Sequence, residues 1–162
     1  MLERAASHNL AEFLLWQGSF ERARSLAERA DALRERFVGP PQVPDSLLLA
    51  RICACTGDRA AAQAQLRVAR DACGDDEPPA HTVLADAVER WLSAEDLSEW
   101  EPVLEAGAEL PAEERIEVCD LLRRWARRAG SDAGEQVAIE RASEALAATP
   151  LWQSRWAAAE SG

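Results

Sequence analysis

The sequence predicts an all-helical protein. Through most of the chain, apolar residues recur every three or four positions, which is the spacing of one face of an α-helix. Clusters of glycine and proline, which end helices, interrupt this spacing at regular intervals. No stretch has the sustained alternation of apolar and polar residues that a half-buried strand needs. We therefore expect a series of short helices and no sheet.

Four helices are expected in the first half of the chain. Leu10, Phe13 and Leu14 follow helical spacing. Gly18-Ser19 and Gly57-Asp58 leave almost no room for a loop, so each is expected to join two helices into an antiparallel hairpin. The break "VGPPQVPD" separates the two hairpins. The expected helices are 2–17, 20–36, 43–56 and 58–73.

Five further helices are expected after the break "GDDEPP". Helical spacing continues through the apolar residues from Val83 to Trp91 and from Ile116 to Ala126. The segments "LPAEE", "GSDAG" and "TP" supply the remaining breaks. The expected helices are 79–93, 96–109, 111–129, 133–148 and 150–160.

Alanine recurs at fixed offsets in the second helix of each early pair. Small residues at such positions let two helix axes approach closely. Each helix pair has two apolar faces and cannot bury both alone, so we expect the pairs to stack. These alanines are Ala23, Ala27 and Ala30, followed by Ala62 and Ala69.

This pattern resembles the tetratricopeptide repeat family. The first repeat is matched by Leu10, Ala11, Leu14, Gly18, Phe20, Ala23, Ala27 and Ala30, and the second by Leu49, Ala50, Cys53, Gly57, Ala62, Leu66 and Ala69. Weaker matches follow at Ala87, Val88, Trp91, Leu97, Leu104 and Gly107, and then at Leu122, Ala138, Ala142, Ala145 and Pro150. The resemblance implies a single right-handed solenoid domain over 1–162, with repeats at 2–37, 43–73, 79–110 and 111–148 and a cap helix at 150–160.

The net charge of −11 is distributed unevenly. Sixteen of the 29 acidic residues lie between Asp71 and Asp120, a segment with only two arginines. Such a surface repels phosphate backbones, so nucleic acid is not an expected partner. The segment is either a solubilising face or a docking surface for a basic partner. With no membrane-length apolar run and no signal-peptide pattern, we expect no membrane association and a cytoplasmic location.

Residue types that enzymes and cofactors require are sparse. The chain has no lysine, which excludes Schiff-base chemistry and a Walker-type phosphate lysine. Neither a G-x-S-x-G motif nor a glycine-rich phosphate loop is present. His8 and His81 lack a set of partners at metal-ligand spacing, and Cys53-Ala54-Cys55 lacks C-x-x-C spacing. We therefore expect no catalysis, cofactor or metal, and we interpret the cysteines as small buried residues, with a redox switch as the alternative.

Six tryptophans are the most informative large residues. Trp91, Trp100 and Trp125 lie where packing between helices needs bulk, so we place them in the core. The repeat register instead puts Trp16 on the concave face. Trp152 and a second tryptophan four residues later form one stripe, which packs on the fourth repeat or meets a partner.

The resemblance implies a concave groove made by the first helix of each repeat. The expected groove residues are His8, Asn9, Glu12, Leu15, Trp16, Leu47, Leu48, Arg51, Asp86, Glu89, Leu92, Arg124, Arg127 and Arg128. Family members that grip a chaperone tail use asparagines and basic residues, of which only Asn9 is matched, so that ligand is disfavoured. We expect a partner of basic and apolar character.

The sequence thus favours a non-catalytic protein-interaction scaffold or adaptor that holds a peptide or protein in its concave groove. The alternative is a regulatory helical-repeat segment of a larger bacterial signalling protein, such as a kinase or an ATPase-linked regulator. The sequence leaves the oligomeric state open.

Overall fold

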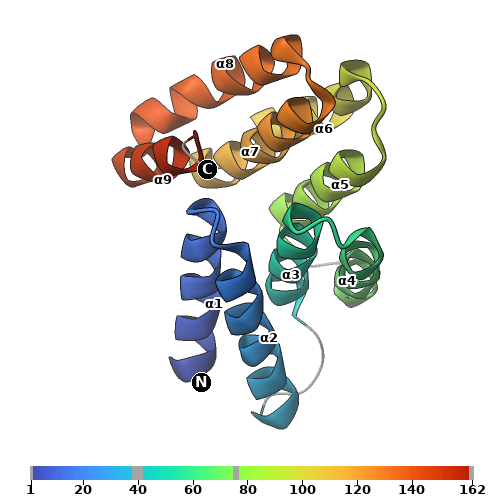
Figure 1. The fold of residues 1–162 in the computed structure, drawn as a ribbon, viewed down its shortest axis with the longest axis vertical. Coiled ribbons are helices and arrows are strands. Elements are labelled where there is room, and N and C mark those ends of the chain that lie inside the picture. The colour runs from blue at the N-terminus through green and yellow to red at the C-terminus, as the bar shows by residue number, and fades with distance from the viewer. Residues whose placement is uncertain (1, 38–41, 75–76, 161–162) are drawn as a thin grey trace. The chain divides into compact units, whose positions relative to one another are not determined.

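The computed structural model describes residues 2–37, 42–74 and 77–160, so parts of two expected breaks lie outside it. Within these ranges the chain forms nine α-helices and no strand, which confirms the all-α prediction (Figure 1). The helices are α1 (Leu2–Trp16), α2 (Phe20–Phe37), α3 (Val43–Cys55), α4 (Arg59–Ala72), α5 (Pro79–Ser93), α6 (Glu101–Ala108), α7 (Ala112–Ala129), α8 (Asp132–Ala148) and α9 (Pro150–Glu160).

One expected helix is divided. The segment predicted as 96–109 begins with a 3-10 turn, η1 (Leu97–Trp100), and only then continues as α6. Asp96 starts η1 through a capping box, in which its side chain accepts a hydrogen bond from the Ser98 amide at 2.9 Å. Pro102 then lies in the first turn of α6, where its missing N–H costs nothing. The α-helical part is therefore only eight residues long.

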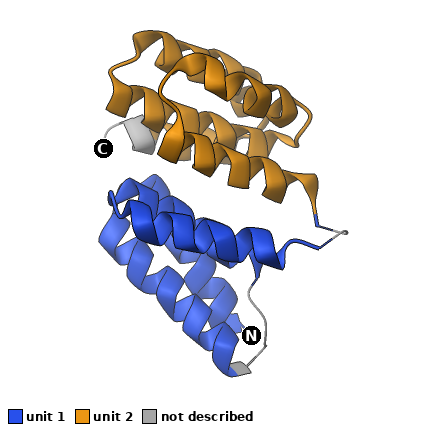
Figure 2. Cartoon of the chain, turned by 90° about the vertical axis from the view of Figure 1, so that its right-hand side faces the viewer, with its two compact units in different colours: residues 1–77, 158–162 blue, residues 78–157 orange. Residues whose placement is uncertain are grey.

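The chain divides into two compact units (Figure 2). Unit 1 comprises 1–77 with 158–162, and unit 2 comprises 78–157. Each unit is described below by itself. The single repeat domain expected from the sequence stays a prediction.

Unit 1 contains two helical hairpins with the same turn. Gly18 and Gly57 have φ angles of +71° and +79°, a left-handed conformation that glycine adopts without strain. The residue after each glycine donates its N–H to a carbonyl five positions earlier, from Ser19 to Leu14 and from Asp58 to Cys53, at 2.9 Å in both turns. This shared geometry explains why the sequence repeats itself and confirms the predicted α1–α2 and α3–α4 pairs.

Alanines line the closest approach of these hairpins. Ala23 and Ala62 are fully buried, and Ala27, Ala30 and Ala69 are at most 3% exposed. The core around the first hairpin joins α1, α2 and α3 through Ala11, Leu14, Leu15, Ala23, Ala27, Leu48, Leu49 and Ile52. The alanine positions predicted from the repeat pattern are therefore core positions.

A buried carboxylate ties α1 to α3. Asp45 accepts hydrogen bonds from Nη1 of Arg4 at 2.5 Å and from Nδ1 of His8 at 2.7 Å, and its side chain is 5% exposed. Burial raises the pKa of Asp45, but the hydrogen bond and charge of His8, together with Arg4, outweigh burial and hold this pKa below its ordinary value.

Unit 2 is organised around α7. Its core includes the three tryptophans that the sequence placed there, which are at most 4% exposed. The rings of Trp100 and Trp125 lie 6.0 Å apart, and Nε1 of Trp125 donates to the Ala94 carbonyl at 3.1 Å. At Gly134 a Cβ atom would lie 3.0 Å from the Ala126 side chain, so α8 crosses α7 closely.

A second buried carboxylate connects α7 to α9. Asp120 accepts hydrogen bonds from Arg123 at 2.9 Å and from Arg124 at 2.7 Å. Burial raises the pKa of Asp120, and the two arginines more than reverse this effect, so the net shift is downward. Arg123 also stacks on the Trp156 ring, 3.8 Å from its centroid. Trp156 of the α9 stripe therefore packs on its own unit.

Replacing the crossing alanines should disrupt the hairpins. Ala23→Trp and Ala62→Trp insert a large ring where two helices touch, and we expect each to lower the free energy of unfolding by about 1–3 kcal/mol or more. Ala60→Trp, at an exposed position of α4, is the matched control. Thermal or urea melts that place all three variants together would show that these crossings are not close.

Removing the Asp45 carboxylate should destabilise unit 1 in a pH-dependent way. We expect Asp45→Asn to lower the free energy of unfolding by about 1–3 kcal/mol at neutral pH, because the neutral amide removes the charge that pairs with the half-buried Arg4 and His8 side chains and replaces one acceptor oxygen with an NH2 donor. Since the folded-state pKa of Asp45 is lowered, the contribution is present above about pH 4 and is lost as the pH falls through that pKa. Urea titrations across this range should show the variant and the parent converging in acid, and a constant gap would contradict this assignment.

Candidate functional site

Most apolar residues of the expected concave groove are core residues instead. Leu15, Leu47, Leu48 and Leu92 are at most 5% exposed, and Trp16 is 1% exposed. Arg51, also expected on the groove, is 5% exposed. The expectation that these side chains form an open surface is therefore wrong. The repeat register predicted that these residues lie in helices. It did not predict the direction in which each side chain points, because degenerate repeats leave the rotation of a helix about its axis undetermined.

The polar groove residues differ in exposure and in their contacts within each unit. Asn9 and Glu89 are exposed, Glu12 and Asp86 are half-buried, and His8 contacts Asp45. The three arginines expected to receive an acidic ligand have intramolecular acceptors. These are Asp120 for Arg124, Glu135 for Arg127 at 2.8 Å, and the Trp91 carbonyl for Arg128. Whether any of them also binds a partner stays a prediction.

Because Trp16 is buried, its removal should affect stability first. We expect Trp16→Ala to lower the free energy of unfolding by about 3–5 kcal/mol, the usual cost of the cavity left by a large aromatic side chain. Leu10→Ala on the same helix removes a side chain that is 47% exposed and should change it by less than about 0.5 kcal/mol. Equal urea midpoints for the two variants would show that Trp16 is a surface residue and not a core residue.

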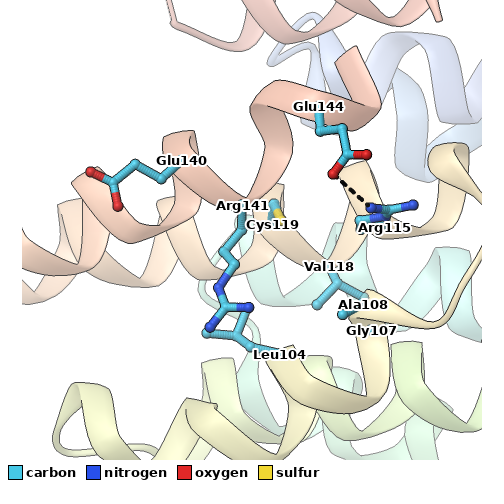
Figure 3. A pocket seen from close by; sticks show the side chains of 9 residues that line it. All are labelled: Leu104, Gly107, Ala108, Arg115, Val118, Cys119, Glu140, Arg141 and Glu144. Atoms are coloured by element: carbon cyan, nitrogen blue, oxygen red, sulfur yellow. Dashed lines mark ion pairs between the residues drawn. The ribbon is translucent and has the colours of Figure 1, made fainter. Parts of the chain in front are cut away.

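A concave site of unit 2 lies between α6 and α8, with α7 at its floor. One part of it is a hollow of about 210 Å³. Leu104, Gly107 and Ala108 come from α6, Val118 and Cys119 from α7, and charged side chains surround this apolar floor (Figure 3). The charged residues are Arg115 from α7 and Glu140, Arg141 and Glu144 from α8.

A second hollow extends the same groove toward η1. It has a volume of about 340 Å³ and is lined by Leu97, Ser98, Glu101, Leu104, Val137 and Arg141. Leu104 and Arg141 line both hollows, so Arg141 lies at the middle of the groove. From Val137 to Glu144 the groove follows α8 for about 10 Å, given the helical rise of 1.5 Å per residue. We call the two hollows together the α6–α8 groove.

The two arginines of this groove lack close acidic partners in the described ranges, although Glu101, Glu140 and Glu144 also line it. Among the described residues, Arg141 has no hydrogen bond or ion pair, and its side chain extends across the hollow toward Leu104 (Figure 3). Arg115 forms only a long ion pair of 3.9 Å with Glu144, whose side chain is 90% exposed. Glu140 points away from the hollow and accepts a hydrogen bond from Gln136 at 2.8 Å. The guanidinium group of Arg141 therefore lies over the apolar floor without an acceptor in the described part of the chain.

Cys119 on the groove floor is a neutral, unreactive thiol. Burial raises its pKa to about 12, although the charges of Arg115 and Arg141 act in the opposite direction. Thiolate chemistry at neutral pH therefore has no support here. The charges of Arg115 and Arg141 nevertheless both act to lower the pKa of the Cys119 thiol, so both guanidinium groups lie near the same hollow.

A third hollow, in unit 1, differs in its electrostatics. It lies among α2, α3 and α4, has a volume of about 250 Å³ and includes Leu49 and Cys53. Its rim charges have partners. Arg24 contacts Glu28 at 2.9 Å and Asp58 at 3.3 Å, and Arg34 contacts Asp31 at 2.8 Å. With these charges satisfied, this hollow offers less to a charged ligand than the α6–α8 groove.

No sequence motif indicated the α6–α8 groove. Arg141 and Arg115 are 26 residues apart and belong to no motif. Their convergence depends on the close crossing of α7 and α8 and on the short length of α6. Of the residues that line the groove, Leu97, Leu104 and Gly107 belong to the third repeat match.

Searches for other kinds of site and for related proteins add little. Within the described residues, no cluster of histidine, cysteine and acidic side chains could hold a metal ion, and no helix is long and apolar enough to cross a membrane. The four cysteines are free thiols. Comparison with models of known protein families, with curated proteins and with solved structures found no match in any of the three.

Proposed function

We propose that this chain is a non-catalytic protein-interaction scaffold, built from tetratricopeptide-like helix pairs, that binds a peptide segment of a partner protein in the α6–α8 groove. The observation that carries the proposal is the groove itself, an apolar floor lined by two arginines that the fold leaves without close acceptors. Concave sites with an apolar lining and a few convergent polar groups are the usual ligand sites of proteins.

The size of the groove favours a short segment over a folded domain. Its length of about 10 Å accommodates about three residues in extended conformation, at about 3.3 Å per residue. A contact of this size buries less surface than a stable complex between two folded proteins, so the interaction would be transient. The neighbouring acidic segment adds a long-range field that attracts basic parts of the same partner.

Filling the groove should abolish peptide binding without unfolding the protein. Ala108 is exposed and lines the first hollow, so the Ala108→Trp side chain would occupy space that the peptide needs. Random peptides displayed on phage and selected on the parent protein should lose most of their binding to this variant. The readout is a titration of the selected peptides, paired with a thermal melt of each protein.

The matched control lies two residues earlier on the same helix. Ala106 is also exposed but lines neither hollow, so Ala106→Trp should bind the selected peptides as the parent does. If no selected peptide distinguishes these two variants, the groove is not a peptide site and the proposal fails.

A further inference from the structure

The charged residues that line the groove indicate which kind of peptide segment it binds. We propose that the occupant is an internal peptide segment in which one aspartate or glutamate, flanked by apolar residues, pairs with Arg141 at the middle of the α6–α8 groove. This inference rests on the proposed function.

Arg141 supplies the first step of the argument. A guanidinium group that has no acceptor in the protein can donate up to five hydrogen bonds, and it matches the planar geometry of a carboxylate. Arg141 is exposed, extends toward the apolar Leu104 side chain, and has no ion pair among the described residues (Figure 3). A carboxylate that enters from the ligand would therefore gain a partner without displacing one.

Arg115 reinforces the same preference. Its Nε atom is buried and has no hydrogen-bond acceptor in the described part of the chain, and its ion pair with Glu144 is long. The side chain of Arg115 is only 27% exposed, so its charge is less screened by water than a surface charge. The guanidinium groups of Arg115 and Arg141 therefore both favour an acidic group at the centre of the ligand.

The position of Arg141 selects an internal carboxylate rather than a chain terminus. One hollow lies on each side of it, toward Val137 and toward Glu144. A C-terminal carboxylate at Arg141 would leave one of the two apolar hollows empty. A segment that continues in both directions fills both, and Glu101 in the second hollow disfavours another acidic residue there.

The test uses the peptides selected on the parent protein together with charge variants. We expect these peptides to share one internal Asp or Glu between apolar residues. Changing that residue to Asn or Gln, or making Arg141→Glu in the protein, should weaken binding by at least about tenfold, or 1.4 kcal/mol. A second selection on Arg141→Glu should instead enrich peptides with a central Lys or Arg.

Controls separate this inference from the proposed function. Arg67→Glu changes the net charge equally at an exposed position of unit 1 and should leave binding unchanged. Peptides that need Ala108 but tolerate Arg141→Glu would overturn the carboxylate pairing and leave the proposed function intact. Peptides whose binding is lost on C-terminal amidation would overturn the internal segment, and the absence of any groove-dependent peptide would remove the proposed function itself.

Discussion

Close contact between paired helices at alanine and glycine positions is the constraint on which this structure depends. In α2 and α4 the contact side is lined by alanine, and in α8 it begins with Gly134 and continues through buried alanines. A methyl group or a hydrogen atom at the crossing lets the backbones approach. Large side chains fill the space beside these crossings: the Trp125 ring, for example, lies 3.2 Å from the position of a Cβ atom at Gly134.

Two buried carboxylates make this otherwise apolar packing specific for one arrangement of the helices. Asp45 fixes α1 on α3, and Asp120 holds two arginines, one of which stacks on Trp156 of α9. Buried ion pairs add little net stability compared with apolar packing, but a shifted neighbour would leave a charge without a partner. Such pairs accordingly penalise alternative registers, which a core rich in alanine and leucine would otherwise tolerate.

Sequence patterns predicted the helices well because their signals are local. The glycine turns after α1 and α3 and the proline and glycine clusters elsewhere set most helix ends to within two residues. The candidate groove was not predictable, because it depends on helix rotation. A rotation of one residue, about 100°, moves Trp16 from a groove to the core, and degenerate repeats do not fix that angle. The three arginines of the expected groove, Arg124, Arg127 and Arg128, each have an acceptor within the protein, and their role toward a partner stays a prediction.

The groove itself is a consequence of the short length of α6. The helices α7 and α8 have 18 and 17 residues, whereas α6 has eight, because the Asp96 capping box and η1 use the residues before it. A helix of eight residues is about 12 Å long and cannot cover the face of a helix of about 27 Å. The first hollow lies where α6, α7 and α8 meet, and the buried side chains of Val118 and Cys119 form its floor. Full-length helices at this position would bury Arg115 and Arg141 without acceptors, at a high desolvation cost. The truncation of α6 thus lets this all-helical packing keep two arginines beside an apolar surface.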